Sequence, residues 1–359
     1  MTNRFLLATT ALIAMAACGD SEAQPGSPGS AQARAARTQP TESQLGQPFS
    51  GQQRELIVAL PLPDAVRGGP EVSYETGYAV EPIGENVWMV TDGLYQAMFA
   101  ATGEGVVVFD APPTIGGNLS RAIAETTDEP VTHLVYSHSH IDHIGAASQF
   151  DGVEIVASEE TAAKISRFDD ESRPDPTVTF AEDYTLTVGD LTAELSAAGE
   201  GHEPGNLFIY LPDDGVLMAV DIAFPGWVPF TNLGMAEDVG RYAEHFEELL
   251  AFDFDTFVGG HVGRAGTRDD VETQAAYVAD LVDAANEGRR TVDFTAVAER
   301  TGYDNKWLLV RTYMDEVADV CTETMMAKWS DRLGGADVNT AGHCWVMQEF
   351  LNINGEPSL

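Results

Sequence analysis

The chain has 359 residues, of which 44% are hydrophobic, and this length and composition support one or two globular domains with a sizeable core. Acidic residues outnumber lysine and arginine by 57 to 19, which gives a formal net charge of −38. Because a surface of this sign repels phosphate backbones and anionic lipid, it argues against a nucleic-acid partner. We interpret the acidity as a solvated surface suited to salty surroundings.

The first residues, MTNRFLLATTALIAMAACGD, have the organisation of a secretory signal. A basic start precedes an apolar run from Phe5 to Ala16, which is too short to span a bilayer. The small residues before Cys18 resemble the lipobox of bacterial lipoproteins, in which this cysteine is lipidated; cleavage without lipidation is the alternative. Both interpretations predict a signal peptide over residues 1–17 and an exported protein, either periplasmic or anchored in the outer membrane through Cys18.

Residues 18–53 are rich in Ser, Gln, Ala, Pro and Gly and contain few large apolar side chains. Such a composition cannot bury enough surface to offset the entropy lost on folding. We therefore predict a disordered tether over 18–53, and a folded core that begins near residue 54.

Beyond the tether, short β-rich runs are separated by Gly, Asp and Asn: ENVWMVT, YQAMFAAT and GVVVFDA. A helical pattern over 115–127 precedes the apolar strand VTHLVYS and then VEIVAS. After a second helical pattern at 158–168 come the strands YTLTVG, LTAELSAA, NLFIYLP and GVLMAVD, and an amphipathic helix over 236–252. Two strand-rich halves, each followed by helices, predict two sheets packed face to face with helices outside.

After the strand FDTFVGGH the pattern is mostly helical, so we predict a catalytic core over 54–265 and a helical region packed on it over 266–359. The helical region contains Cys321 and Cys344. In an oxidising compartment these two cysteines have no competing partner if Cys18 is lipidated or removed, and we predict a disulfide between them. Two buried free thiols are the alternative. Nothing in the sequence indicates the oligomeric state.

Three histidines and an aspartate are crowded into HSHIDH, directly after an apolar strand. His138 and His140 are two residues apart in extended chain, so they point the same way and can share one ion. Asp142 and His143 follow where the chain turns, and they can face a second ion. Closed structural zinc sites usually use several cysteines, which lie elsewhere in this chain, so the pattern favours a catalytic metal site.

Three further candidate ligands each follow a predicted strand. His202 lies in GEGHEPGN, Asp221 ends GVLMAVD, and His261 ends FVGGH. With the four residues of the cluster they provide five imidazoles and two carboxylates, which suit two neighbouring divalent ions with a shared solvent ligand. We interpret the remaining histidines as ordinary surface or core residues: His133, His245 and His343.

The stretch HSHIDH matches the H-x-H-x-D-H motif of the metallo-β-lactamase superfamily, and GHEPGN, the strand-ending Asp221 and GGH follow in that superfamily's order. The resemblance covers roughly residues 87–264. It implies an α/β fold, an αββα sandwich of two mixed sheets with helices on both outer faces. It also implies a ligand set: His138, His140 and His202 for the first ion, Asp142, His143 and His261 for the second, and Asp221 bridging both.

The resemblance further implies a hydrolase of small molecules in which two Zn²⁺ ions, with Mn or Fe as substitutes, hold a bridging hydroxide that attacks an ester, lactone or β-lactam carbonyl. Asp142 would then be both a ligand and the proton relay to the leaving group. Asp221 is typical of the glyoxalase II and lactonase type of site, since many β-lactamases of the superfamily have a cysteine or a non-ligating residue there. Thioester hydrolysis of the glyoxalase II type and a mononuclear iron persulfide dioxygenase are the alternatives.

The segment IAFPGWVPF, which follows Asp221, is stiff and apolar. Phe224, Trp227 and Phe230 either wall a substrate pocket or pack under the next helix, and both interpretations stay open. Three tyrosines could donate to an oxyanion, and nothing in the sequence selects among them: Tyr184, Tyr210 and Tyr242.

Overall fold

The computed structural model describes residues 60–168 and 170–357. The predicted signal peptide (1–17), Cys18 and the predicted tether (18–53) lie outside the described residues, and these predictions stay predictions. Within the described part of the chain, no helix is both long enough and apolar enough to cross a membrane.

The first sheet has seven strands, which lie side by side in chain order. They are β1 (Ala79–Gly84), β2 (Val87–Thr91), β3 (Gln96–Ala101), β4 (Val106–Phe109), β5 (Val131–Val135), β6 (Glu154–Ser158) and β7 (Val178–Phe180). The strands from β1 to β4 are antiparallel, and those from β4 to β7 are parallel. The parallel strands are joined by crossovers that contain α1 (Gly117–Thr126), α2 (Ile141–Ile144), a 3₁₀ turn at Ala147–Gln149, and α3 (Glu159–Ile165). A further 3₁₀ turn at Asp64–Val66 precedes the sheet.

The second sheet has five strands in the order β12-β11-β10-β9-β8. Their bounds are β8 (Asp183–Val188), β9 (Leu191–Gly199), β10 (Asn206–Leu211), β11 (Val216–Met218) and β12 (Thr256–Val258). Because β10 is antiparallel to both β9 and β11, and β12 is parallel to β11, the strands β9, β11 and β12 run in the same direction. Their carboxyl ends therefore lie at one edge of the sheet.

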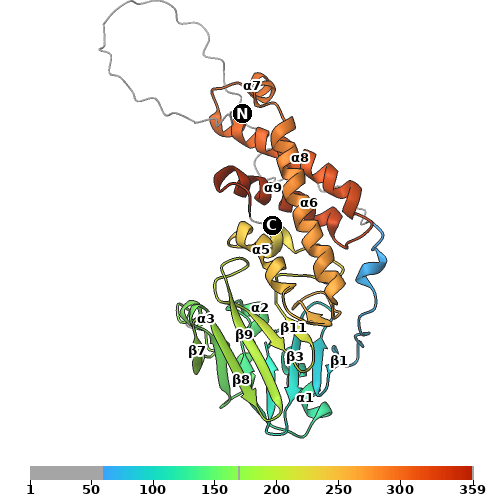
Figure 1. Cartoon of the computed structure of the whole chain (residues 1–359), viewed down its shortest axis with the longest axis vertical. Coiled ribbons are helices and arrows are strands. Elements are labelled where there is room, and N and C mark those ends of the chain that lie inside the picture. The colour runs from blue at the N-terminus through green and yellow to red at the C-terminus, as the bar shows by residue number, and fades with distance from the viewer. Residues whose placement is uncertain (1–59, 169, 358–359) are drawn as a thin grey trace, which may run out of the picture. The chain divides into compact units, whose positions relative to one another are not determined.

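Three apolar layers hold the two sheets and their helices together. Alternation along β10 sends Leu207 and Ile209 into the layer between the sheets and Phe208 to the outer face. On the outside of the first sheet, α1 and α2 bury Leu119 and Ile144. Together these layers confirm the predicted αββα sandwich of two mixed sheets (Figure 1).

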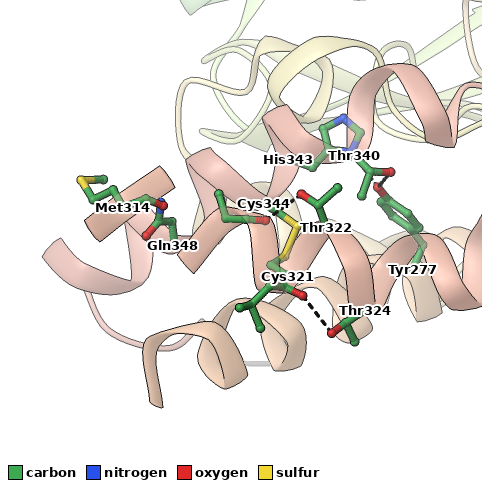
Figure 2. Close-up of a disulfide and its surroundings, with 11 residues drawn as sticks. Tyr277, Met314, Cys321, Thr322, Thr324, Thr340, His343, Cys344 and Gln348 are labelled. Atoms are coloured by element: carbon green, nitrogen blue, oxygen red, sulfur yellow. Dashed lines mark hydrogen bonds between the residues drawn. A yellow bond between two sulfur atoms is a disulfide. The ribbon is translucent and has the colours of Figure 1, made fainter. Parts of the chain in front are cut away.

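A layer of helices lies on the outer face of the second sheet, and its members are α5 (Val239–Leu249), α6 (Arg268–Thr291), α8 (Lys306–Trp329) and α9 (Ala336–Ile353). Their apolar faces share one buried cluster with Phe208 and Phe257 of the sheet. The helix α7 (Phe294–Thr301) lies away from the sheet and packs on α8 (Figure 1). The helices α6, α8 and α9 pack against one another (Figure 1). A disulfide between Cys321 of α8 and Cys344 of α9 confirms the predicted pairing (Figure 2).

A buried hydrogen-bond chain runs beside the disulfide and ends on the loop that follows Asp221. His343 Nε2 lies 3.1 Å from the carbonyl oxygen of Phe230, which can only accept, so this nitrogen carries the proton. In the neutral ring Nδ1 must then accept from the Tyr277 hydroxyl, 2.8 Å away, and that hydroxyl accepts from Thr340 at 3.1 Å. Figure 2 shows Thr340, Tyr277 and His343 side by side. This chain of bonds ties α6 and α9 to the loop.

The neutral His343 makes stability depend on pH. Burial lowers the pKa of His343 to about 4, below its ordinary value of 6.5 in the unfolded chain. Between pH 6.5 and 4 the unfolded state therefore binds the proton and the folded state does not, so stability falls as pH falls. One pH unit in this range corresponds to about 1.4 kcal/mol. Between pH 7 and 4, the free energy of unfolding of the metal-free protein should therefore fall by about 3 kcal/mol more than that of the His343→Gln variant.

Urea unfolding at several pH values measures the stability of the two proteins. If their stabilities fall in parallel with pH, His343 is not the buried neutral group that we assign.

Candidate metal centre

The strand directions deliver the predicted ligands to one edge of the sandwich. His138, His202, Asp221 and His261 each lie three residues beyond the end of a strand: β5, β9, β11 and β12. Three of these strands run in the same direction in the second sheet, so their ends meet, and β5 brings the motif HSHIDH from the first sheet. All seven predicted side chains come together there. They form two groups, His138, His140, His202 and Asp221 in one, and Asp142, His143 and His261 in the other.

In the first group, the candidate ligand atoms all lie within 4.8 Å of one another. His202 Nε2 is 3.1 Å from His140 Nδ1 and 3.3 Å from Asp221 Oδ2. His138 Nε2 is 3.6 Å from the same carboxylate oxygen. Three imidazole nitrogens and one carboxylate oxygen therefore face a common point.

The second group also contacts the Asp221 carboxylate. His143 Nε2 is 3.1 Å from Asp221 Oδ2, and His261 Nε2 is 3.0 Å from Asp221 Oδ1. The two rings are 3.1 Å apart at their Nε2 atoms. Asp142 completes the group from the first turn of α2. Asp221 has a left-handed backbone, φ 63°, which an aspartate tolerates better than most residues.

These donors fit a metal because protons alone cannot satisfy them. His138 Nε2 is buried and has no hydrogen-bond partner, although it points toward the carboxylate. Burial lowers the pKa of both His138 and His202, so these rings are neutral. Burial by itself would raise the pKa of Asp221, but His143 and its neighbours hold that pKa well below the ordinary value. The two neutral imidazoles of His138 and His202 and the ionised carboxylate are nitrogen and oxygen donors of the kind that Zn²⁺, Mn²⁺ and Fe²⁺ accept.

Asp110 orients His138 through Ser137. Asp110 directly follows β4, has a left-handed backbone, and accepts from the Ser137 amide at 2.8 Å and from its hydroxyl at 2.7 Å. Because the hydroxyl proton is committed to Asp110, the Ser137 oxygen accepts from His138 Nδ1, 2.9 Å away. His138 Nε2 is thereby left as a bare lone pair toward the metal group.

Glu203 orients His140 from the opposite side. This carboxylate is fully buried; it accepts from the Ser139 hydroxyl, and its Oε1 lies 3.2 Å from Lys164 Nζ. Its other oxygen lies 3.2 Å from His140 Nε2. A carboxylate at this distance favours the proton on Nε2 and leaves Nδ1 free to face His202. Sequence reasoning missed Glu203, although it sits inside the quoted GHEPGN.

Tyr95 is the tyrosine that stands at the site. Its hydroxyl donates to Asp142 Oδ2 at 3.3 Å, and its ring lies 4.5 Å from that of His261 between centroids. Burial, aided by the Asp142 charge, raises the pKa of Tyr95 to about 12, so it stays a donor. The three candidate tyrosines from the sequence have other partners: Tyr184 stacks on Phe180, Tyr210 donates to the carbonyl oxygen of Asp253, and Tyr242 donates to that of Ile222.

A cavity of about 850 Å³ opens onto Asp142, Asp221 and His261. Phe224, Trp227 and Phe230 all line it, which supports the pocket interpretation of the IAFPGWVPF segment. The next helix, α5, begins only at Val239. The residues in between form a left-handed turn from Asn232 to Met235, the short α4 (Thr231–Met235).

The three histidines that we set aside lie outside the two groups. His133 is half-buried on β5, 3.7 Å from Glu154, and His343 belongs to the chain of bonds that ends at Phe230. His245 is buried in α5, with its Nδ1 3.2 Å from Glu248. Each has a structural partner away from the metal groups.

Replacing Glu203 by glutamine should weaken metal binding without unfolding the protein. The neutral amide removes the charge that holds the His140 proton on Nε2, and losses of about 10- to 100-fold in affinity are typical of such changes. Glu237→Gln is the matched control, because the Glu237 side chain also pairs with Lys164, at 2.7 Å, and its link to the ligand His202 is a backbone hydrogen bond that the substitution keeps. Competition with a fluorescent chelator measures both variants. Equal affinities would refute the orienting role of Glu203.

Parts of the chain are similar to known proteins in sequence and in fold. Residues 90–261 match the family model described as the Metallo-beta-lactamase superfamily. The alpha subunit of a 2,4-dinitroanisole O-demethylase from Nocardioides sp. (strain JS1661) is 28% identical over 241 residues, which cover 65% of this chain and 73% of that protein. A metallo-beta-lactamase structure from Pontibacter korlensis is 25% identical, with a TM-score of 0.47, over 56% of this chain and 99% of that one.

The stereoselective inverting sec-alkylsulfatase Pisa1 from Pseudomonas sp. has a TM-score of 0.53 at 17% identity, and the match covers 77% of this chain and half of that one. This likeness speaks for the fold alone. The matched segment contains all seven residues of the two groups. Residues 90–261, which carry this histidine and aspartate metal site, therefore form a metallo-beta-lactamase domain, and the protein is a metal-dependent hydrolase.

Proposed function

We propose that the protein is an exported zinc hydrolase with two metal ions, which opens the carbonyl group of an ester, a lactone or a β-lactam. The observation that carries the proposal is the position of Asp221, whose carboxylate faces histidines of both groups: Oδ2 faces His138, His202 and His143, and Oδ1 faces His261. One carboxylate between two donor groups is suited to two neighbouring ions. When bound, such ions supply a nucleophilic water at neutral pH and polarise a carbonyl oxygen.

The proposal gives each donor a place. The first ion would be held by His138, His140 and His202, the second by Asp142, His143 and His261, with Asp221 shared. Asp110 and Glu203 keep the ring protons of His138 and His140 away from the metal side, so these two ligands need no rearrangement.

Asp142 is the residue proposed to move protons. Its side chain is 40% exposed, whereas His138 and His143 are fully buried, and it lines the cavity. It can take a proton from the attacking water and return it to the leaving group. Tyr95 donates to Asp142 Oδ2 and keeps its own proton, because its pKa is about 12, so it fixes the orientation of this carboxylate.

The arrangement of donors argues against one of the two alternatives and does not distinguish the other. A mononuclear iron persulfide dioxygenase needs one ion, and it leaves the group of Asp142, His143 and His261 without a purpose. A thioester hydrolase of the glyoxalase II type would use the same donors and the same attack on a carbonyl, so only the substrate separates it from the proposal.

A second candidate activity comes from the O-demethylase named among the relatives. Water that attacks the ether-bearing carbon of an activated aryl methyl ether gives a phenol and methanol, with no change of oxidation state. The same nucleophile and the same proton relay would serve this reaction, and an aromatic cavity would hold the ring. We keep it as the second candidate because that relative is similar over 73% of its length.

Metal content and a substrate panel test the proposal together. The purified protein should bind two zinc ions per chain, and the zinc-loaded form should hydrolyse at least one of a nitrophenyl ester, an acyl-homoserine lactone or a chromogenic cephalosporin. Hydrolysis of a thioester alone would favour the glyoxalase II type of enzyme, and hydrolysis of 2,4-dinitroanisole alone would favour the second candidate. Mass spectrometry of the metals and product assays measure these outcomes. One iron per chain together with oxidation of a persulfide would replace the proposal by its alternative.

Asp142→Ala should reduce the zinc content from two ions toward one and lower turnover by about 10²- to 10⁴-fold, because it removes both a ligand and a positioned proton carrier. His133→Gln is the control, since His133 lies on the strand that leads to the motif but faces Glu154. Full turnover in Asp142→Ala with one zinc bound would refute the assigned role.

A further inference from the structure

We propose, resting on the proposed function, that the natural substrate is a neutral, apolar molecule of medium size, and that residues outside the family-matched segment select it. The cavity that opens onto the metal groups is lined mainly by carbon. Apart from Asp142 and Asp221, its walls come from five separate stretches: residues 62–72, 93–95, 224–235, 261–264 and 335–339. The first and last of these lie outside residues 90–261.

Charge in the cavity argues against an anionic substrate. Arg264 is the one lysine or arginine among the described residues that line it. Its Nε and Nη2 donate to the carbonyl oxygen of Ala65, at 3.0 and 2.8 Å. Nη1 and Nη2 donate to Asp270 at 3.0 and 2.6 Å, and Nη1 also donates to Ala265 at 3.0 Å. All five N–H groups are thus committed, and none is left for a substrate carboxylate or sulfate.

The rim of the cavity is apolar as well as its walls. Five large apolar side chains that line it are each at least half exposed to solvent: Leu62, Leu94, Phe230, Met235 and Val338. A gathering of exposed apolar side chains around a cavity mouth marks a binding surface, since isolated ones would need no explanation. A volume of about 850 Å³ is typical of sites for drug-sized ligands, so the occupant is larger than an acetyl ester.

Part of this rim is held in a costly conformation. Asn232, Leu233 and Met235 have positive φ angles of 54°, 59° and 58°, which residues other than glycine rarely adopt. Leu233 is fully buried and anchors the turn, while His343 holds the carbonyl of Phe230 from α9. The surrounding structure therefore fixes Phe230 and Met235 before a substrate arrives, which lowers the entropy cost of binding.

A matched pair of esters tests the proposal. p-Nitrophenyl hexanoate and the p-nitrophenyl monoester of adipic acid differ only by the replacement of a terminal methyl group by a carboxylate. We expect kcat/KM for the neutral ester to exceed that for the anionic one by at least tenfold. We also expect kcat/KM to rise at least tenfold from acetate to hexanoate, since one buried methylene is worth about fourfold. An anionic ester that reacts as well as the neutral one overturns the proposal.

A binding measurement, which needs no turnover, tests the substrate class independently of the proposed function. If neither ester is hydrolysed, binding takes the place of kinetics, and the zinc-loaded protein is titrated with hexanophenone and with 6-oxo-6-phenylhexanoate, its carboxylate counterpart. Calorimetry should show at least tenfold tighter binding of the neutral ketone. Equal binding, or binding of the carboxylate alone, overturns the substrate class whatever the reaction is.

Val338→Lys tests whether the rim selects. Val338 is exposed near the start of α9, so a lysine fits there without unfolding the helix, and its charge should reduce the preference for the neutral ligand at least fivefold. Ile353→Lys is the matched control, because Ile353 is exposed at the other end of the same helix and does not line the cavity. An unchanged preference in Val338→Lys, or an equal change in both variants, refutes selection by this rim.

Discussion

The site depends on one buried carboxylate. Asp221 is nearly inaccessible to solvent, yet three imidazoles and the unpaired nitrogen of His138 surround it, and its pKa is held well below the ordinary range. An ionised carboxylate in such surroundings is stable only when positive charge or metal compensates it. The rest of the edge is arranged to supply that compensation: parallel strand directions bring His202 and His261 to it, and the first sheet brings HSHIDH from the other side.

Much of this arrangement could be predicted from the sequence because it follows from local rules. A histidine or aspartate just after an apolar run lies at a strand end, and strand ends that point the same way meet. Asp110, Glu203 and Tyr95 could not be found in this way, because their importance lies in contacts with residues far along the chain, such as Glu203 with His140 and Tyr95 with Asp142. Even so, Asp110 follows the apolar run in GVVVFDA just as Asp221 ends GVLMAVD. This similarity could have indicated from the sequence that Asp110 also lies near the site.

The fold was predictable for a similar reason, and the cavity was not. Alternating and continuous apolar runs reveal strands, and paired strand-rich halves reveal a sandwich. The short β7 leaves little pattern, and the left-handed turn at Asn232 to Met235 leaves none, because its backbone is imposed by tertiary packing on residues that do not favour it. For the same reason, the sequence could not show that all five N–H groups of Arg264 donate to the protein itself. It therefore could not predict whether the cavity favours neutral or anionic ligands.

The cavity walls also bear on how such a protein diverges from its relatives. The metal donors all lie within residues 90–261, whereas Leu62 and Val338 contribute to the walls from stretches before and after it. Mutations in these outer stretches can change which molecules enter while the donors and their orienting partners stay intact. Descendants of one ancestral gene can therefore keep the same chemistry and acquire different substrates through changes in these outer stretches.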